Sequence, residues 1–461
     1  MYLSIVRALR TGISPRIAFV GAGGKTTAMF QLARELNKEQ NTPVIITATS
    51  HLGAWQISRA DMHIIAESPT VLEENKNTFK GVILITGDLD GEKTNPINDH
   101  MLNWILQYCD DHSFPLLIEA DGSRQKPLKA WNDHEPPIPT FVNHVVQVVG
   151  ITGLGKVLNH EHVHRPEVFS SLSGLNIGEP VTTAALIQVL KHVEGGLKNI
   201  PKDARRSVLL NQADTVQLQA IAHGLAQPLL PVYHSVVISS LEQESIFAVH
   251  ERIAGVILAA GESARFGATK QLLDWKGKPF VRAVAMTALD AGISPVIVVT
   301  GANAEKVESA VDDLNVIIVR NDDWKSGQAS SIKAGLGNLI PNLSLRSASQ
   351  SPNVVEENVG GAIFLLTDQP QITPSILRAL VQKHAEGLYP IVAPMVMDRR
   401  ANPVLFDRDT FTDLMTLEGD VGGRAVFHKY RVEYLPWHDD SLLLDVDTPE
   451  MYQRLISDET L

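Results

Sequence analysis

The chain has 461 residues, 44% of them hydrophobic, which allows roughly two to four domains with buried cores. Its formal net charge of −12 and its short basic clusters exclude non-specific nucleic-acid binding, and its single cysteine excludes an intramolecular disulfide. No apolar run approaches the roughly 18 residues of a membrane span, and arginines interrupt the N-terminal apolar stretch. We therefore expect a cytoplasmic protein without a membrane span or a signal peptide.

Short β-branched runs alternate with longer segments of helical period, a pattern typical of parallel sheets with crossover helices. In the first half the predicted strands are Ile17–Val20, Val44–Thr47, Val82–Thr86, Leu116–Glu119, Val145–Val149, Val208–Asn211 and Val236–Ser239. In the second half they are Val256–Ala259, Val296–Thr300, Val316–Val319, Ile363–Thr367, Ile391–Ala393, Pro403–Phe406 and Leu442–Val446. We predict two Rossmann-like three-layer α/β/α domains, at residues 1–248 and 252–461. Between them, Leu241–Arg252 is expected to form a short helix or linker, and Cys109 falls in a predicted helix.

A glycine-rich loop, VGAGGKTT (20–27), joins the first predicted strand to an amphipathic helix. This P-loop-like segment supplies backbone amides, a lysine for the β- and γ-phosphates and hydroxyls for Mg²⁺ at a helix N-terminus. Its candidate residues are Gly21, Gly23, Gly24, Lys25, Thr26 and Thr27. Phe19 stands where a full Walker A motif has glycine, so the loop is more similar to the compact loop of the Mur ligases. We interpret it as a nucleotide site rather than a plain turn.

Two later segments support a nucleotide site in this half. The predicted strand at 116–119 ends in Glu119, with Asp121 just beyond it, where a carboxylate can orient magnesium or water. Asn211 and Asp214 in VLLNQAD resemble the base-reading motif of GTPases, but Gln212 replaces its lysine. Both ATP and GTP therefore stay open as the nucleotide.

Three histidines alternate in NHEHVHRPEVF: His160, His162 and His164. On a strand they would share one face and could bind a metal ion. The nearby Pro166 favours a loop, in which His164 and Arg165 would bind an anion or a partner.

A second glycine loop, LAAGESARFGATKQ (258–271), follows the first predicted strand of the second half. Loops at the carboxyl ends of strands are where open α/β sheets bind ligands. Candidate anion contacts come from the backbone of Ala259, Ala260, Gly261 and Gly267 and from the cations of Arg265 and Lys270. Asp368, Asp445 and Asp447 end later predicted strands, and carboxylates with phosphate oxygens suit Mg²⁺. Asp447 could equally cap a turn or helix.

The segment LAAGESARFGATKQLLDWKGKPFVRAV resembles the molybdenum cofactor nucleotidyltransferases, which have a nucleotide-diphospho-sugar-transferase-like fold. Further matching motifs follow in order over residues 252–455: RNDDWKSGQASSIKAGL, LLTDQP, ANPVLF with EGDVGGRAVF, and LDVDTPE. LAAG with DQP is typical of the cytidylyl branch, whereas the guanylyl branch has glycine at the position of Ala260. The resemblance implies transfer of CMP from CTP to the molybdopterin cofactor, giving the cytosine dinucleotide and pyrophosphate.

The same resemblance implies roles for individual residues. Arg265 and Lys270 would offset triphosphate charge, and Asp368 with Asp445 or Asp447 would hold Mg²⁺. Pterin, ribose or phosphate contacts are implied for Gly327, Gln328, Ser330, Ser331, Gln369, Asp420 and Arg424. Two departures, Thr367 in place of glycine and Ala401–Asn402 before the Pro-Val-Leu-Phe stretch, concern the pterin side of the pocket.

In the first half, GAGGKTT, EADGSR, KPLKA, HRPEVF and LNQAD resemble the selenium-dependent hydroxylase accessory proteins over residues 10–240. This resemblance implies a context in the maturation of molybdenum hydroxylases, with an enzyme of the xanthine-dehydrogenase type as partner. The chain would then be a cytidylyltransferase fused to a nucleotide-binding accessory domain. Two alternatives stay open: a sugar- or polyol-phosphate nucleotidyltransferase, and a nucleotide-gated module that hands a cofactor to a molybdoenzyme.

Overall fold

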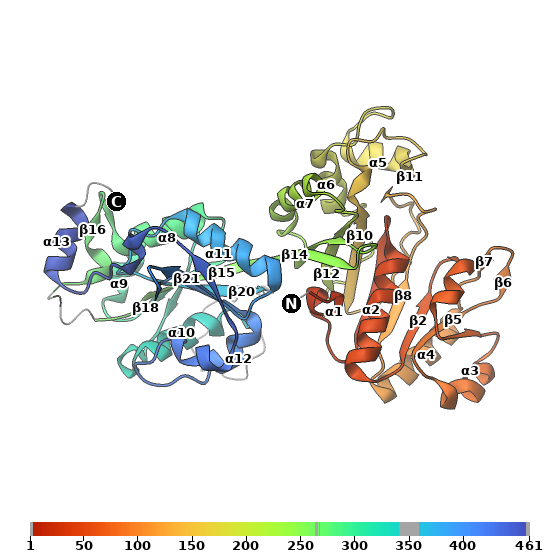
Figure 1. Cartoon of the computed structure of the whole chain (residues 1–461), viewed down its shortest axis with the longest axis horizontal. Coiled ribbons are helices and arrows are strands. Elements are labelled where there is room, and N and C mark those ends of the chain that lie inside the picture. Colours follow the sequence, from red (N-terminus) through yellow and green to blue (C-terminus); the bar gives the residue numbers. More distant parts are fainter. Residues whose placement is uncertain (1–2, 263–265, 267, 341–358, 458–461) are drawn as a thin grey trace. The chain divides into compact units, whose positions relative to one another are not determined.

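The computed structural model describes residues 3–262, 266, 268–340 and 359–457. Within it the chain divides into two compact units, Met1–His250 and Glu251–Leu461, each with its own sheet (Figure 1). The predicted pair of α/β domains is confirmed. Arg265 and Gly267, predicted to contact an anion, lie outside the described residues.

The first unit contains a nine-stranded sheet whose central strands are parallel. Across the sheet the strands are β14 Ser245–Glu251, β13 Ser235–Ser240, β12 Arg205–Asn211, β10 His144–Gly150, β1 Arg16–Gly21, β8 Leu116–Glu119, β2 Val44–Ala48, β5 Val82–Thr86 and β4 Met62–Ile65. The helices are α1 Ile5–Leu9, α2 Lys25–Gln40, α3 Pro69–Asn75, α4 Asp99–His112, α5 Pro166–Ser173, α6 Thr183–Lys191 and α7 Val216–Leu229. One apolar core packs α3 and α4 against the sheet, while α2 contacts β1, β2 and β8 directly.

Every strand predicted in this half is present. Not predicted were β4 and the two-residue strands β3 Leu52–Gly53, β6 Leu89–Asp90, β7 Lys93–Thr94, β9 Leu128–Lys129 and β11 Val163–His164. The expectation of a short helix or linker at 241–252 was wrong, because β14 occupies most of that segment. The turn before it includes Glu244 in the left-handed region at φ 51°, which lets the chain turn back so that β14 lies beside β13. A single residue, Arg252, separates β14 from the first strand of the second unit.

The second unit has an eight-stranded mixed sheet. Its strands are β19 Ile317–Arg320, β18 Val296–Thr300, β15 Ile253–Ala259, β20 Gly361–Leu366, β23 Val404–Asp407, β21 Ile391–Val396, β22 Arg399–Arg400 and, paired with β21, β24 Val432–Pro436. The helices are α8 Phe280–Asp290, α9 Ala304–Ser309, α10 Gln328–Gly337, α11 Pro374–Gly387, α12 Phe411–Leu414 and α13 Pro449–Ser457. This arrangement agrees with the nucleotide-diphospho-sugar-transferase-like fold that the sequence motifs predict.

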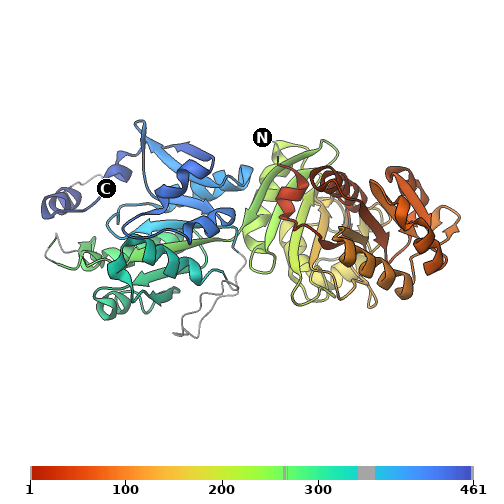
Figure 2. The ribbon, with the colours of Figure 1, turned by 90° about the horizontal axis from the view of Figure 1, so that it is seen from below.

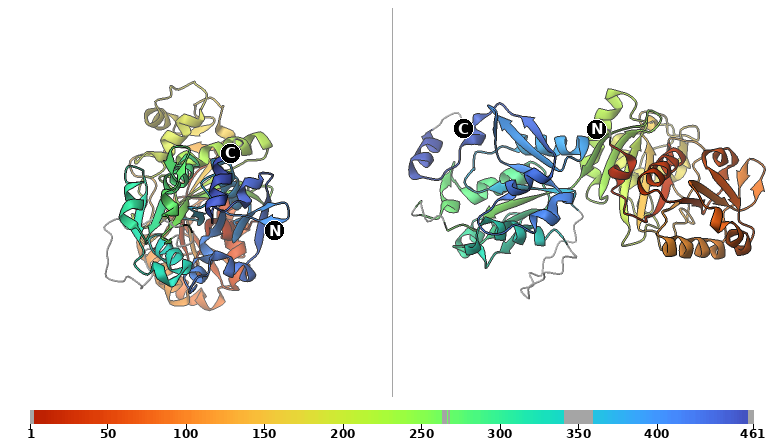
Figure 3. Two further views of the ribbon diagram at one scale, coloured as in Figure 1. Left: turned by 90° about the vertical axis from the view of Figure 1, so that its left-hand side faces the viewer. Right: turned by 60° about the horizontal axis from the view of Figure 1, so that its bottom comes forward.

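Two apolar cores cover the two faces of this sheet. Because side chains alternate along β15, Ile253 and Ile257 pack with α8 and α11, whereas Ala254 and Val256 pack with α10 and α12. Figures 2 and 3 show the ribbon from further directions. The three-layer arrangement leaves the carboxyl edge of the sheet free for loops.

The predicted strand at Leu442–Val446 was wrong: a 3₁₀ turn, Asp440–Leu443, is followed by extended chain. Its carbonyls are bound by side chains instead of a neighbouring strand. Gln371 Nε2 donates to the oxygens of Ser441 and Leu444 at 3.0 and 2.7 Å. The glutamine contacts hold this segment beside the end of β20.

Candidate functional site

A cavity of about 540 Å³ opens at the carboxyl edge of the second sheet. The strands β15, β18 and β20 run in the same direction and end together there. The lining residues are Leu258, Ala260, Gly261, Glu262, Lys270, Gln271, Trp324, Lys325, Ser326, Gly327, Gln328, Ser331, Leu366, Thr367, Asp368 and Asp420. Segments far apart in the sequence thus meet in one cavity. Half of the residues predicted to bind substrates or metal in this half line it: Ala260, Gly261, Lys270, Gly327, Gln328, Ser331, Asp368 and Asp420.

Lys270 lies between two carboxylates at this cavity. Its Nζ is 3.1 Å from Asp368 Oδ2 and 2.9 Å from Asp447 Oδ1. Burial alone would lower the pKa of Lys270, but the negative charges of Asp368 and Asp447 outweigh it and raise that pKa. The ammonium therefore stays protonated and can donate to phosphate oxygens.

Asp368 keeps one carboxylate oxygen uncommitted. Its Oδ1 is buried and has no hydrogen-bond partner within the described part of the chain. A buried acceptor without a partner costs free energy unless a donor or cation meets it. This atom suits a divalent ion that arrives with a nucleotide.

The other two predicted metal ligands are engaged within the protein. Asp445 Oδ1 accepts a hydrogen bond of 2.7 Å from Gln369 Nε2, and burial together with the charges of Asp368 and Asp447 raises its pKa. Asp447 pairs with Lys270. Over the described residues, no group of three or more His, Cys, Asp or Glu side chains forms a metal-binding cluster.

Gln271, which sequence reasoning missed, fixes the glycine loop from behind. Its buried side chain donates through Nε2 to the carbonyls of Ala259 and Gly261 at 3.3 and 2.7 Å. With these carbonyls held by the amide group, neighbouring backbone N–H groups are left for an anion. The sequence offered one signal for this role, which is that Gln271 directly follows Lys270. An uncharged glutamine does not by itself suggest a part in anion binding.

The start of α10 closes the opposite side of the cavity. Gly327 has φ 110°, and a Cβ there would lie 2.4 Å from the carbonyl of Gly419. The amide of Gln328 donates to Asp420 Oδ1 at 3.4 Å. Glycine at 327 is therefore required by close packing against the 419–420 segment.

Ser330 and Ser331 have different surroundings, although both are held by Asn321. Asn321 Nδ2 donates to their hydroxyls at 2.8 and 3.1 Å. Ser330 also donates to Gly327 O, whereas Ser331 lines the cavity. Arg424 is exposed and does not line it, but its charge acts on Asp445.

The wall around Ala260 is tightly packed. Ala260 lines the cavity and is 3% exposed. A Cβ at the neighbouring Gly301 would lie 2.8 Å from the Cβ atoms of both Ala260 and Trp324. The methyl group of Ala260 therefore sets the position of one wall.

The first unit carries its glycine loop at the equivalent edge, between β1 and α2. Gly21, Gly23 and Gly24 all have positive φ, at 96°, 80° and 128°. A Cβ at Gly23 would lie 2.3 Å from the backbone nitrogen of Gly150. The predicted compact loop is thus present, and α2 begins at Lys25.

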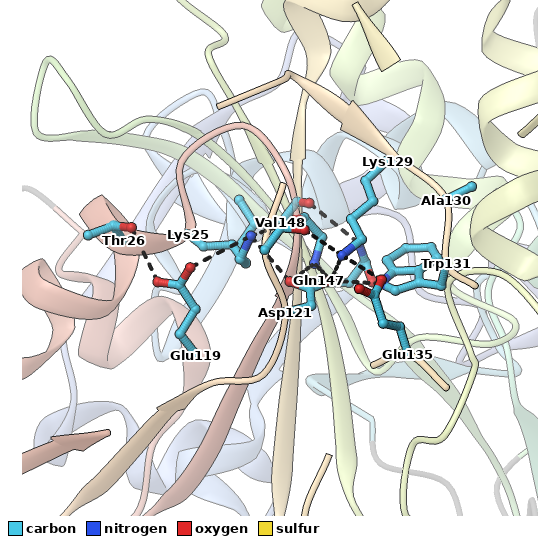
Figure 4. A network of polar contacts seen from close by, with 12 residues as sticks. Lys25, Thr26, Glu119, Asp121, Lys129, Ala130, Trp131, Glu135, Gln147 and Val148 are labelled. Atoms are coloured by element: carbon cyan, nitrogen blue, oxygen red, sulfur yellow. Dashed lines mark hydrogen bonds and ion pairs between the residues drawn. The ribbon is translucent and has the colours of Figure 1, made fainter. Parts of the chain in front are cut away.

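Lys25 and Thr26 face two buried carboxylates after β8 (Figure 4). Lys25 Nζ donates to Gly21 O at 2.7 Å and lies 3.2 Å from Asp121 Oδ1 and 4.0 Å from Glu119 Oε1. Thr26 Oγ1 donates to Glu119 Oε2 at 3.2 Å. Asp121 accepts from the Gly21 amide at 3.0 Å, which ties the end of β8 to the loop.

Burial and neighbouring charges act oppositely on these two acids. Burial raises the pKa of Glu119 despite the nearby Lys25. Burial also acts to raise the pKa of Asp121, but Lys25 and Lys129 outweigh it and the pKa is lowered. Asp121 is therefore the ionised partner of the lysines.

The network continues through Lys129, Trp131 and Glu135, which sequence reasoning missed, and through Arg165, which it assigned to an anion or a partner. Lys129 Nζ lies 2.9 Å from Asp121 Oδ2 and 3.1 Å from Glu135 Oε2. Trp131 Nε1 donates to Asp121 at 2.7 Å, and Arg165 Nη2 donates to Glu135 at 2.7 Å. Burial would raise the pKa of Glu135, but Arg165 and Lys129 lower it to about 2.

The predicted base-reading pair is engaged elsewhere. Asn211 Nδ2 donates to Gly23 O at 2.7 Å, and its Oδ1 accepts from Leu241 N at 2.9 Å. Asp214 Oδ1 accepts from Ser240 at 2.5 Å. Asn211 thus positions the glycine loop, and base contact by Asn211 and Asp214 stays a prediction.

The two halves match different known families. Residues 17–167 match the model of the YqeC protein family, and residues 255–456 match the MobA-like NTP transferase domain. The uncharacterized protein YqeC of Escherichia coli is 31% identical over 220 residues, which cover 46% of this chain and 82% of that protein. The nicotine blue oxidoreductase of Paenarthrobacter nicotinovorans is 30% identical over 213 residues, covering 44% of this chain and 96% of that protein. The chain is a YqeC domain followed by a MobA-like NTP transferase domain.

A solved structure also resembles the MobA-like domain in sequence. Rv0371c from Mycobacterium tuberculosis is 28% identical, covering 45% of this chain and 98% of its own, with a TM-score of 0.38. No helix in the described residues is long and apolar enough to cross a membrane.

The remaining candidates of the YqeC domain are separated from one another. His160 contacts Glu167 at 2.8 Å, His162 contacts Asn159 at 3.1 Å, and His164 lies on the two-residue strand β11, Val163–His164. The three histidines do not gather as a metal site. Burial raises the pKa of the Cys109 thiol in α4 to about 12, which keeps that thiol protonated and unreactive.

Proposed function

We propose that the MobA-like domain transfers CMP from CTP to the molybdopterin form of the molybdenum cofactor, giving the cytosine dinucleotide and pyrophosphate. The observation that carries this proposal is the single cavity that gathers the glycine loop, Lys270, Asp368 and the start of α10. The LAAG and DQP motifs favour cytidylyl transfer within the nucleotidyltransferases.

The chemistry asks the protein mainly for positioning and charge neutralisation. An oxygen of the acceptor's terminal phosphate attacks the α-phosphorus of CTP, and the bond to the β-phosphate breaks as pyrophosphate leaves. Lys270 donates to the triphosphate, while Gln271 keeps the loop carbonyls turned from it. An ionised phosphate is already a nucleophile, so no general base is required.

A divalent ion fits the residues present, because Asp368 Oδ1 is a buried oxygen without a partner in the described chain. Asp368, with Asp445 or Asp447 beside it, would hold Mg²⁺. When bound, the ion neutralises charge on the phosphates. Lys270 would share these carboxylates and complete the positive side of the site.

The acceptor side of the cavity is assigned to the 324–331 and 420 segments. Gly327, Gln328 and Ser331 offer small and polar contacts for pterin or ribose. Arg424 is exposed nearby and would meet the acceptor phosphate.

For the YqeC domain we propose binding of a second nucleoside triphosphate, ATP or GTP, on the loop Gly21–Thr27. The support is the loop itself, opening α2, with Lys25, Thr26 and Glu119 converging on one point. The context would be maturation of a molybdenum hydroxylase of the xanthine-dehydrogenase type. A nucleotide-gated handover of the cofactor would use the same site.

Product analysis tests the transfer. We expect the full-length protein, molybdopterin cofactor, Mg²⁺ and CTP to yield cytosine dinucleotide and pyrophosphate, with far less product from ATP, GTP or UTP. Chromatography with mass detection of the dinucleotide provides the measurement. Turnover of sugar or polyol phosphates in place of the cofactor would support the alternative transferase and contradict the proposal.

Replacing Ala260 by glycine should relax the preference for CTP over GTP. The methyl group of Ala260, which packs beside Gly301 and Trp324, narrows the cavity where the base would bind. We expect the ratio of kcat/KM for CTP to that for GTP to fall about 10-fold, the scale of one small group in a pocket. Discrimination equal to that of the wild type would show that Ala260 does not set base size. Ala334→Gly, on α10 but outside the cavity lining, serves as the control for added backbone freedom.

A further inference from the structure

The short segment between β8 and Lys129 is tied to the glycine loop of the YqeC domain at both ends. At one end, Asp121 accepts from the Gly21 amide and pairs with Lys25. At the other, Pro127 O accepts from Gly150 N at 3.0 Å, and a Cβ at Gly23 would lie 3.0 Å from the same oxygen. The five residues 122–126 therefore have to lie beside the glycine loop.

Arg124 stands at the tip of this segment. Lys126 N donates to Ser123 O at 3.1 Å, closing a turn with Arg124 and Gln125 at its centre. Each central residue is three residues or fewer from an anchor, so the Cα of Arg124 lies within about 11 Å of both anchors. Its side chain can reach an anion on the glycine loop.

The backbone of the turn is strained. Arg124 has φ 50° and Gln125 has φ 59°, both in the left-handed region that favours glycine or asparagine. Two such residues in succession cost free energy, and strain of this kind is concentrated at functional sites.

The charges of the buried network balance without Arg124. The cations Lys25, Lys129 and Arg165 pair with the carboxylates Glu119, Asp121 and Glu135. A bound polyphosphate would therefore add negative charge that these cations do not offset.

Arg124 and Lys126 are the two cations of the anchored segment 122–126, and they can offset that charge. Neither makes an ion pair or a side-chain hydrogen bond with any residue in the described part of the chain, and Arg124 is exposed. The charge of Arg124 is felt at His164, where burial, Lys129, Arg165 and Arg124 together lower the pKa to about 4. His164 is therefore neutral near pH 7, and Arg124 supplies the positive charge at this end of the segment.

A second observation points to a ligand at this loop. Gln147 is 2% exposed and lies against the first glycine, since a Cβ at Gly21 would be 2.2 Å from its Nε2. Its Oε1 has no hydrogen-bond partner among the residues described. A donor brought by a ligand, such as the water of a hydrated metal–nucleotide complex, would satisfy it.

We infer that Arg124, supported by Lys126, is a phosphate-binding residue of the N-terminal nucleotide site and contacts the terminal phosphate of the bound triphosphate. The loop amides and the N-terminus of α2 enclose the inner phosphates, so a residue outside the loop reaches the phosphate that projects beyond it. The planar guanidinium suits two phosphate oxygens at once. The inference rests on the proposed nucleotide site.

Nucleotide binding to the full-length protein tests it, with CTP present in excess to fill the other domain. Dissociation constants of ATP, ADP, GTP and GDP with Mg²⁺ are measured by calorimetry for wild type, Arg124→Ala, Arg124→Lys and Lys25→Ala. We expect Arg124→Ala to weaken triphosphate binding about 10-fold or more and to change diphosphate binding little, because one charge-assisted contact is lost. Arg124→Lys should restore part of the loss.

Lys202→Ala is the matched control, an exposed cation of the same domain. Its affinities should equal those of the wild type, and melting temperatures of all variants exclude unfolding. Suppose that Lys25→Ala no longer binds nucleotide while Arg124→Ala binds triphosphate with an affinity within about twofold of wild type. The inference about Arg124 is then wrong, but the proposed nucleotide site is supported. Equal losses of diphosphate and triphosphate would overturn the terminal-phosphate assignment. A wild-type protein that binds none of the four nucleotides would overturn both the site and the inference.

Discussion

Replacing Asp368 by alanine is expected to abolish nucleotidyl transfer while leaving the fold intact. Asp368 follows β20 at the cavity, where Oδ2 pairs with Lys270 and Oδ1 is buried without a partner in the described residues. Removing it takes away the carboxylate best placed for Mg²⁺ and releases Lys270 from one of its two acids. We expect kcat/KM for CTP to fall by about 100-fold or more, the scale of losing one electrostatic element of a transition-state site.

Asp368→Asn tests whether the negative charge of the side chain is required, since asparagine has nearly the same size and shape but no charge. It should be nearly as inactive as Asp368→Ala, with a melting temperature close to that of the wild type. Asp313→Ala, which removes a surface ion pair with Arg282, should transfer CMP normally. Transfer by Asp368→Asn within about tenfold of wild type would remove Asp368 from the metal site.

Lys25→Ala is expected to weaken nucleotide binding in the YqeC domain about 10- to 100-fold and to leave transfer in the MobA-like domain unchanged. The ammonium is buried at the loop, bound to Gly21 O and Asp121. A lysine contact to phosphate in such surroundings contributes about 10- to 100-fold in affinity. Calorimetry with ATP or GTP measures the loss, and the CTP product assay measures the transfer.

The variant also leaves buried carboxylates with one cation fewer, so its stability must be measured. Lys129 still neutralises Asp121 at 2.9 Å, which limits the damage. Thr26→Val serves as a second variant because it removes only the hydroxyl that donates to Glu119 and leaves every charge in place. Both variants should retain transfer. Loss of CMP transfer in a folded Thr26→Val protein would mean that the two domains are chemically coupled.

Local pattern was sufficient to predict most of the fold. Runs such as Val44–Thr47 and Val296–Thr300 are buried on both faces of parallel sheets, so they read as continuous apolar stretches. β14 was missed because it is an edge strand following a tight turn, and its polar residues resemble a linker. At Leu442–Val446 the apolar run correctly indicated a buried segment but wrongly indicated a strand. Glutamine side chains, instead of a neighbouring strand, donate hydrogen bonds to the carbonyls of this region.

Sequence reasoning found the site residues whose charge suits phosphate or metal. It missed residues whose role depends on where they lie in the folded chain. Lys270 and Asp368 have the residue types that phosphate and metal require, and the structure brings them together. Gln271 acts through backbone carbonyls, and Lys129 acts through the carboxylates of Asp121 and Glu135 on either side of it in the sequence, and no spacing rule indicates either contact. The motif of Asn211 predicts base contact, which stays a prediction, and it gave no sign that the amide supports Gly23.

The passage from β14 to β15 through Arg252 alone decides where this chain can be cut. A truncation placed at residue 241 would strip the outermost strand from the first sheet and leave the backbone of β13 bare, which invites self-association. Separate expression of the two halves should therefore divide the gene between codons 251 and 252, after the last residue of β14.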